Sequence, residues 1–221
     1  MTVHVVNLYP TRDPEVLRRR SVALESWIEN LWSRGVEPVI EAGEAIPFVA
    51  DMIDFGFRRN PDGLILTNAD TCVLPDALPT IREALDAYGC YYSRRVDLPR
   101  IDAPLDSRLP LRWPPYAGAD LFAMTRQWWV NTSPRWPDLY FAREGWDFVM
   151  KAKMQESGFR PNGTIIYHEK HEAAWKQNIT TDPFQIHNRQ ECERWAKASG
   201  YGRYLYTQPP YLFALEVGEL S

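Results

Sequence analysis

The chain lacks the long apolar segments that membrane spans and export signals require. No run of 18 apolar residues occurs among its 221 residues, and no apolar stretch precedes the strand pattern that begins almost at Met1. Cysteine is scarce as well: Cys72, Cys90 and Cys192 are odd in number and show no C-x-x-C spacing. This usage favours reduced thiols over a disulfide framework or a zinc site. These absences predict a cytoplasmic protein with no membrane span.

A strong net charge is also lacking. The 25 basic and 29 acidic side chains leave a formal charge of -4, which gives no general reason to expect a polyanionic partner. Local basic clusters occur at residues 18–20, 58–59 and 94–95, and such runs are more often solvated than part of a binding patch. Trp and Pro are abundant instead, with nine and eighteen residues, and they indicate rigid loops that carry aromatic side chains.

Apolar periodicity alternates between strand-like and helix-like segments. Strands are predicted over residues 3–8, 36–41, 64–67, 90–96, 119–124 and 164–167, with helices after Asp13 and around residues 48–56, 78–89, 146–155 and 189–199. The alternation predicts an α/β fold: a mostly parallel, Rossmann-like sheet with helices on both faces, in a single compact domain. Residues 97–117 contain five prolines and are predicted to form a lid or binding loop.

The segment Asn68-Ala69-Asp70 directly follows the third predicted strand. Ligands of open α/β sheets bind outside the carboxyl ends of the strands. In an extended chain, side chains at positions i and i+2 lie on the same side, so Asn68 and Asp70 are expected to approach one cation. Mg²⁺ or Mn²⁺ would suit these oxygen ligands and would bridge the protein to a diphosphate.

In this position the triplet resembles the Asp-x-Asp motif of the nucleotide-sugar-dependent glycosyltransferases of the GT-A fold, with Asn68 in place of the first acid. The resemblance implies a transferase domain over residues 1–175 and a C-terminal extension over residues 176–221 that packs on it. It implies Asp70, His168 and Asn68 as metal ligands. His168 is preferred to His171 because it directly follows the last predicted strand, although a surface helix start with paired charges is the alternative for this segment.

The same resemblance implies a donor site for the nucleoside diphosphate sugar. Its residues are Asn7, Tyr9 and Arg12 after the first strand and Asp51 on the second helix, together with Asn68 and Asp70. Tyr9 can stack on a base and Arg12 can meet a phosphate. For Asp51, an exposed helical acid with no ligand is an equally good interpretation.

The catalytic side chains that the resemblance implies lie further along the chain. Asp120 is expected to face the sugar, and Asp147 or Glu144 is expected to be the general base that deprotonates the acceptor hydroxyl of an inverting enzyme. The alternative is that Asp147 and Glu144 only stabilise the N-terminus of a helix through its dipole.

The leading hypothesis is therefore a metal-dependent glycosyltransferase that moves a sugar from a nucleoside diphosphate sugar to a hydroxyl acceptor. The acceptor is a glycan, a lipid-linked group or a small molecule, with hydroxymethylated pyrimidines of phage DNA as a minority hypothesis. A sugar nucleotidyltransferase is less favoured because residues 7–13 contain no glycine-rich phosphate loop. A non-catalytic nucleotide or nucleic-acid binding module is the third possibility, with Trp113, Trp128, Trp129 and Trp136 as stacking surfaces. The donor sugar, the stereochemistry and the oligomeric state stay open.

Overall fold

The computed structural model describes residues 1–43, 45–59, 61–105, 119–161, 163–171, 180–201, 204–205 and 214–215. The strands are β1 (Thr2–Leu8), β2 (Val36–Ala42), β3 (Gly63–Thr67), β4 (Thr71–Val73), β5 (Cys90–Leu98), β6 (Ala119–Thr125), β7 (Ile166–Glu169), β8 (Tyr204–Leu205) and β9 (Ala214–Leu215). The α-helices are α1 (Pro14–Asn30), α2 (Val49–Phe57), α3 (Ala77–Tyr88), α4 (Arg126–Thr132), α5 (Trp146–Glu156) and α6 (Pro183–Ala198). Two short 3₁₀ helices cover Trp32–Arg34 and Ser133–Arg135.

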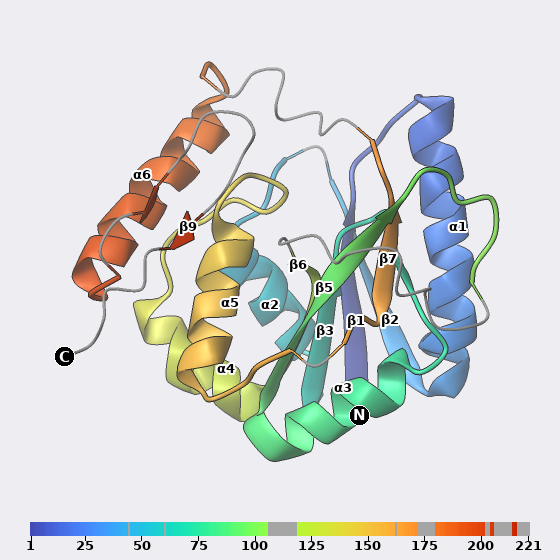
Figure 1. Cartoon of the computed structure of the whole chain (residues 1–221), viewed down its shortest axis with the longest axis horizontal. Helices are drawn as coiled ribbons and strands as arrows, with labels where there is room; N and C mark the ends of the chain where they lie inside the picture. The colour runs from blue at the N-terminus through green and yellow to red at the C-terminus, as the bar shows by residue number, and fades with distance from the viewer. Residues whose placement is uncertain are drawn as a thin grey trace.

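Seven strands form one sheet in the order β2-β1-β3-β6-β5-β7-β4 (Figure 1). The β1–β2, β1–β3 and β5–β7 pairs are parallel, whereas the β3–β6, β5–β6 and β4–β7 pairs are antiparallel. The sheet is therefore mixed, and the prediction of a mostly parallel sheet is wrong. The chain leaves β5 and re-enters the sheet at the same end, where Arg94 pairs with Ala119, so β6 has to run backwards. Apolar periodicity carries no information about strand direction.

Helices cover both faces of this sheet, as predicted. On one face, the ring of His4 in β1 contacts Trp27 of α1 at 5.0 Å between centroids. On the other face, α2 approaches β1 so closely that a Cβ atom on Gly56 would lie 2.6 Å from Cγ2 of Val5. Because successive strand residues point to opposite faces, α1 and α2 lie on opposite sides. Figure 1 shows α1 and α5 flanking the sheet in the same way.

Local signals placed most of the elements correctly. Asp13 caps α1 as predicted, with Oδ1 accepting hydrogen bonds from the backbone N–H groups of Glu15 at 2.9 Å and Val16 at 3.3 Å. Gly35 follows the first helical segment with a φ of 87°. Other elements were not predicted: strands β4, β8 and β9, helix α4, the first turns of α6 and the two 3₁₀ helices. β4 has only three residues and follows a turn, so its length carries almost no periodic signal.

Helix α4 buries two of the tryptophans that were considered as stacking surfaces. Trp128 and Trp129 both belong to the hydrophobic core, and Trp136 packs edge-on against Trp129. Trp113 lies outside the described residues. In the described part of the chain, no helix combines the length and apolar character that crossing a membrane demands.

The strand directions gather several chain segments at one end of the sheet. Strands β1, β3, β5 and β7 point the same way, and β6 starts where β3 ends because Thr67 pairs with Leu121. We call this end the rim: the carboxyl ends of β1, β2, β3, β5 and β7 together with the amino end of β6. Polar and charged residues that follow different strands can therefore meet at the rim.

Candidate active site

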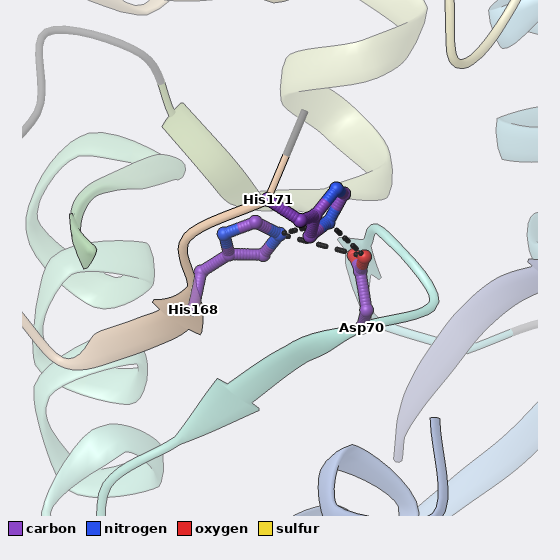
Figure 2. Close-up of side chains that lie close together, drawn as sticks. All are labelled: Asp70, His168 and His171. Carbon is purple, nitrogen blue, oxygen red and sulfur yellow. Dashed lines mark hydrogen bonds and ion pairs between the residues drawn. The ribbon is translucent and has the colours of Figure 1, made fainter. Parts of the chain in front are cut away.

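Asp70, His168 and His171 converge at the rim (Figure 2). Oδ2 of Asp70 lies 3.0 Å from Nε2 of His171 and 3.4 Å from Nε2 of His168, and the two Nε2 atoms are 3.1 Å apart. One ligand atom from each residue lies within 4.8 Å of the other two. Figure 2 shows both imidazole rings directed toward the carboxylate. We call these residues the triad, and they can hold one metal ion.

The fold brings the triad together through the pairing of β4 with β7. Asp70 lies in the turn between β3 and β4, where the N–H of Thr71 donates to the carbonyl of Asn68 at 3.3 Å. Thr71 then pairs with His168 across the antiparallel β4–β7 ladder. Asp70 therefore lies beside the end of β7, and His171 follows that end by two residues.

The carboxylate of Asp70 and the imidazole of His168 stabilise each other's charged forms. Burial works against the charged form of His168, but hydrogen bonds to Asp70 and Asp97 outweigh it and raise the pKa of His168 to about 9. Burial also opposes the charged form of Asp70, yet the two histidines hold its pKa well below the ordinary value. In the metal-free triad, His168 thus holds a proton that a divalent ion would displace.

A second layer of side chains supports His168. Its Nδ1 lies 3.4 Å from Oδ1 of Asp97, and that oxygen lies 2.9 Å from Nε of Arg95. A carboxylate behind a histidine is the usual support of a metal-ligating imidazole, because it fixes the orientation of the ring.

The chemistry of the donor set fits a divalent metal and narrows its identity. One carboxylate oxygen and two imidazole nitrogens suit a first-row transition ion, whereas Mg²⁺ prefers oxygen ligands. Of the two ions expected from the sequence, Mn²⁺ therefore fits this donor set better than Mg²⁺.

The predicted ligands Asp70 and His168 do come together, and His171, which was set aside in favour of His168, joins them. The spacing of the two histidines was visible in the sequence, but the turn of the chain after β7 was not. Asn68 is oriented differently, because residues 69 and 70 form a turn rather than a continued strand. Its Nδ2 donates to Oδ1 of Asp120 at 2.8 Å, and its buried Oδ1 has no hydrogen-bond partner. The role of Asn68 as a metal ligand stays a prediction.

A second group of charges lies on the β6 side of the rim. Buried Asp120 accepts hydrogen bonds from Asn68 and Arg95. Burial raises the pKa of Asp147 in the first turn of α5, with the charge of Lys151 opposing and that of Asp120 reinforcing the shift. A carboxyl group with a raised pKa next to a second carboxylate is a feature of acid–base sites. Asp120 and Asp147, two of the predicted catalytic residues, thus lie within electrostatic reach of each other.

Glu144 is placed in a different environment from Asp147. Its side chain is buried, with Oε2 accepting from Nε2 of Gln185 at 2.7 Å and lying 3.5 Å from Nε of Arg189. Its backbone N–H donates to Oε1 of Gln185 at 3.0 Å. These contacts join the start of α5 to α6. The catalytic role of Glu144 stays a prediction, and its contacts suit a structural role.

Three of the predicted donor-binding residues, Asn7, Tyr9 and Arg12, lie at or just after the end of β1. Buried Asn7 donates from Nδ2 to Oε2 of Glu41 at 3.3 Å, while its Oδ1 has no hydrogen-bond partner. Burial raises the pKa of Tyr9 to about 12, with Arg143 opposing and Glu41 reinforcing the shift. Neither Glu41 nor Arg143 was predicted to lie beside these residues, because no local pattern links them to the end of β1. Arg12 and Asp51 are exposed, and Asp51 lies in the first turn of α2.

Comparisons with known proteins give little further information. No protein-family model matches the chain, and no curated protein matches it. Among solved structures, the chain is similar to S. aureus TarS residues 1–349, with a TM-score of 0.45 and 9% identity over 88% of this chain and 70% of that one. It is also similar to the same protein in complex with UDP-GlcNAc, with a TM-score of 0.44 and 8% identity over 88% and 71% of the two chains. A similarity of this size does not establish a shared family or activity, so the function has to be argued from the site.

Proposed function

We propose that the protein is a metal-dependent glycosyltransferase that moves a sugar from a nucleoside diphosphate sugar to a hydroxyl acceptor. The observation that carries the proposal is the convergence of Asp70, His168 and His171 at the rim. These residues come from two segments far apart in the sequence. The resemblance to the GT-A glycosyltransferases implies that a metal ion binds at the position of Asp70.

The polar atoms near the end of β1 suit a donor nucleotide. Asn7 and Glu41 present a hydrogen-bonded pair of polar side chains there, and Asn7 has an acceptor oxygen without a partner. In this proposal Asn7 and Tyr9 bind the base and ribose. Arg12 and Asp51 are exposed and complete the donor site from the adjacent loop and helix.

The triad would hold the divalent ion, which when bound neutralises negative charge on the departing diphosphate. Asp147 acts as the general base: its carboxylate takes the proton of the acceptor hydroxyl as that oxygen bonds to the anomeric carbon. The bond between the anomeric carbon and the diphosphate breaks in the same step, and the configuration is inverted. Asp120 orients the sugar, because Asn68 and Arg95 fix its carboxylate.

Several parts of the sequence-based hypothesis remain proposals. They are the acceptor class, the cytoplasmic location, and the division into a domain over residues 1–175 with an extension over residues 176–221. The burial of Trp128 and Trp129 weakens the alternative of a nucleic-acid binding module, because buried rings are not available for stacking on bases.

A thermal-shift and turnover experiment tests the proposal. UDP and GDP are each added with and without Mn²⁺, and ligand binding to the native state raises the melting temperature. We expect metal-dependent stabilisation by one nucleotide, which Asp70→Asn abolishes. Asp147→Asn should keep this stabilisation but lower donor turnover by about 100-fold or more.

Asp86→Asn on the exposed surface of α3 is the matched control, and it should behave as the wild type. If neither nucleotide stabilises the protein in the presence of Mn²⁺, the proposed function is wrong. If turnover survives Asp147→Asn unchanged, the assignment of the base is wrong.

A further inference from the structure

Helix α1 carries three consecutive arginines, residues 18–20, near the rim, and their surroundings differ. Arg18 is engaged with protein groups: it pairs with Glu15 and Glu169, and its Nη1 donates to the carbonyl of Ile101 at 2.7 Å. Within the described residues, neither Arg19 nor Arg20 forms an ion pair with a carboxylate. Among the described residues, two of the three arginines therefore form no ion pair with a carboxylate, and the nearby carboxylates of Glu169 and Asp70 are already paired with Arg18 and with the two histidines.

Both of these side chains are half-buried and lie toward the triad. Arg19 lines the same narrow crevice as Asp70 and Glu169, of which Glu169 already pairs with Arg18, and the buried Nε of Arg19 has no hydrogen-bond partner. Arg20 donates from Nη1 to the backbone carbonyl of Tyr9 at 2.5 Å, which directs its guanidinium across the end of β1. Burial lowers the pKa of Arg20, the charge of Asp70 opposes this shift, and the charge of Arg19 reinforces it.

Two neighbouring guanidinium groups without a carboxylate partner are unfavourable when they are half-buried, unless an anion binds between them. Asp70 cannot fill this role, because its carboxylate already contacts His168 and His171. A divalent ion at the triad would increase the positive charge further. An anion with several negative charges that reaches both the triad and α1 would neutralise this positive charge.

We propose that Arg19 and Arg20 of α1 form a binding site for the diphosphate group of the donor, opposite the metal held by Asp70, His168 and His171. Guanidinium groups suit this ligand because their planar N–H groups match phosphate oxygens. The inference rests on the proposed function and adds residues to it. The sequence analysis assigned the phosphate contact to Arg12, which is exposed. In the structure, Arg19 and not Arg12 lines the crevice beside Asp70. In the transfer step the two arginines would stabilise the negative charge of the leaving diphosphate together with the metal.

Calorimetric titration of the full chain tests this site with two probes, Mn²⁺ alone and inorganic pyrophosphate in the presence of Mn²⁺. Arg19→Met keeps the aliphatic bulk of the side chain and removes its charge. We expect Arg19→Met and Arg20→Met each to weaken pyrophosphate binding by about 10-fold or more. The affinity for Mn²⁺ alone should be unchanged or slightly higher, because a repelling charge is gone. Arg82→Met on the exposed face of α3 is the matched control and should bind both probes as the wild type.

Arg19→Lys separates charge from shape, and it should recover part of the affinity because a lysine offers a point charge without the planar fork. Orthophosphate in place of pyrophosphate should bind more weakly and respond less to both substitutions, since a single phosphate cannot span the triad and α1. Melting temperatures of all variants report whether Arg20→Met disturbs the contact with Tyr9.

The outcomes separate this inference from the proposed function. If the wild type binds pyrophosphate only with Mn²⁺ and both methionine variants bind it equally well, the arginine site is wrong while the proposed function stands. If the variants lose affinity for Mn²⁺ alone in parallel with pyrophosphate, the arginines act on the fold and the site is again wrong. If the wild type does not bind pyrophosphate at all, both proposals fail.

Discussion

Two buried histidines show how differently the interior and the rim of this protein treat the same side chain. His4 in the middle of β1 is 0% exposed and His168 at the end of β7 is 5% exposed. Burial lowers the pKa of His4 to about 3, whereas the carboxylates of Asp70 and Asp97 overcome burial and raise the pKa of His168 to about 9. The neighbours, and not the degree of burial, decide the charge of the ring.

Both ring nitrogens of His4 have an uncharged hydrogen-bond partner. Nε1–H of Trp32 donates to its Nδ1 at 3.2 Å, so the proton of the neutral ring is on Nε2, which donates to Oγ1 of Thr67 at 2.8 Å. The ring of Trp27 covers it from α1. His4 is thus a satisfied core residue, whereas the rim around His168 holds ionised groups and polar atoms without partners. That contrast supports our proposal that the rim is the functional region.

The largest expected effect comes from Asp70→Asn, which removes the carboxylate of the triad. Donor turnover should fall by about 1000-fold, because the charge stabilisation supplied by a metal is worth several kcal/mol. In the metal-free variant, the pKa of His168 should fall from about 9 toward or below the ordinary value, as burial then dominates. Turnover assays and NMR titration of the histidine measure both. An unchanged His168 pKa would show that Asp70 does not set the charge of the rim.

The pH dependence of stability tests whether His4 is a neutral residue of the core. The folded-state pKa of His4 is about 3 and its ordinary value is 6.5, so between these values the unfolded chain binds a proton that the folded chain excludes. Its contribution to stability is complete above pH 6.5 and is lost as the pH falls toward 3. From pH 6.5 to 5, we expect it to lower the free energy of unfolding by roughly 1.5 kcal/mol.

Urea unfolding at each pH measures this loss, and His4→Gln is the comparison variant because an amide can accept from Trp32 and donate to Thr67. The difference in unfolding free energy between wild type and variant should shrink as the pH falls. If the two proteins lose stability in parallel, His4 is not the neutral core residue described above.

Asp97→Asn tests the support behind His168 without removing a ligand of the triad. An amide still reaches Nδ1 of His168 but loses the charge, so the affinity for Mn²⁺ should fall by about 10- to 100-fold. The variant should unfold at nearly the same denaturant concentration as the wild type. Asp86→Asn is again the control. A loss of affinity no greater than in the control would mean that Asp97 does not orient His168.

A further small effect is expected from Trp32→Phe, which removes the donor to Nδ1 of His4. One hydrogen bond is lost and a buried acceptor is left without a partner, so the free energy of unfolding should fall by about 1 to 2 kcal/mol. The affinity for Mn²⁺ should stay at the wild-type value, because His4 and His168 belong to separate regions. A parallel loss of Mn²⁺ affinity would contradict this separation.

Local sequence determined a large part of this protein. The Asp13-Pro14 start of α1, the apolar strands and the position of Asp70 just after a strand all depend on neighbouring residues, and short-range periodicity and capping chemistry encode them. Asp70 and His168 could be predicted from the sequence as candidate metal ligands for the same reason, because each lies at or just after the end of a strand.

Only the tertiary structure decided which of these residues meet. The reversed direction of β6, the pairing of β4 with β7, the inclusion of His171 in the triad and the turn of Asn68 toward Asp120 all depend on contacts between segments far apart in the chain. Strand direction and pairing are chosen by how the whole chain buries its apolar surface and pairs its backbone groups. A local pattern contains no information about that choice.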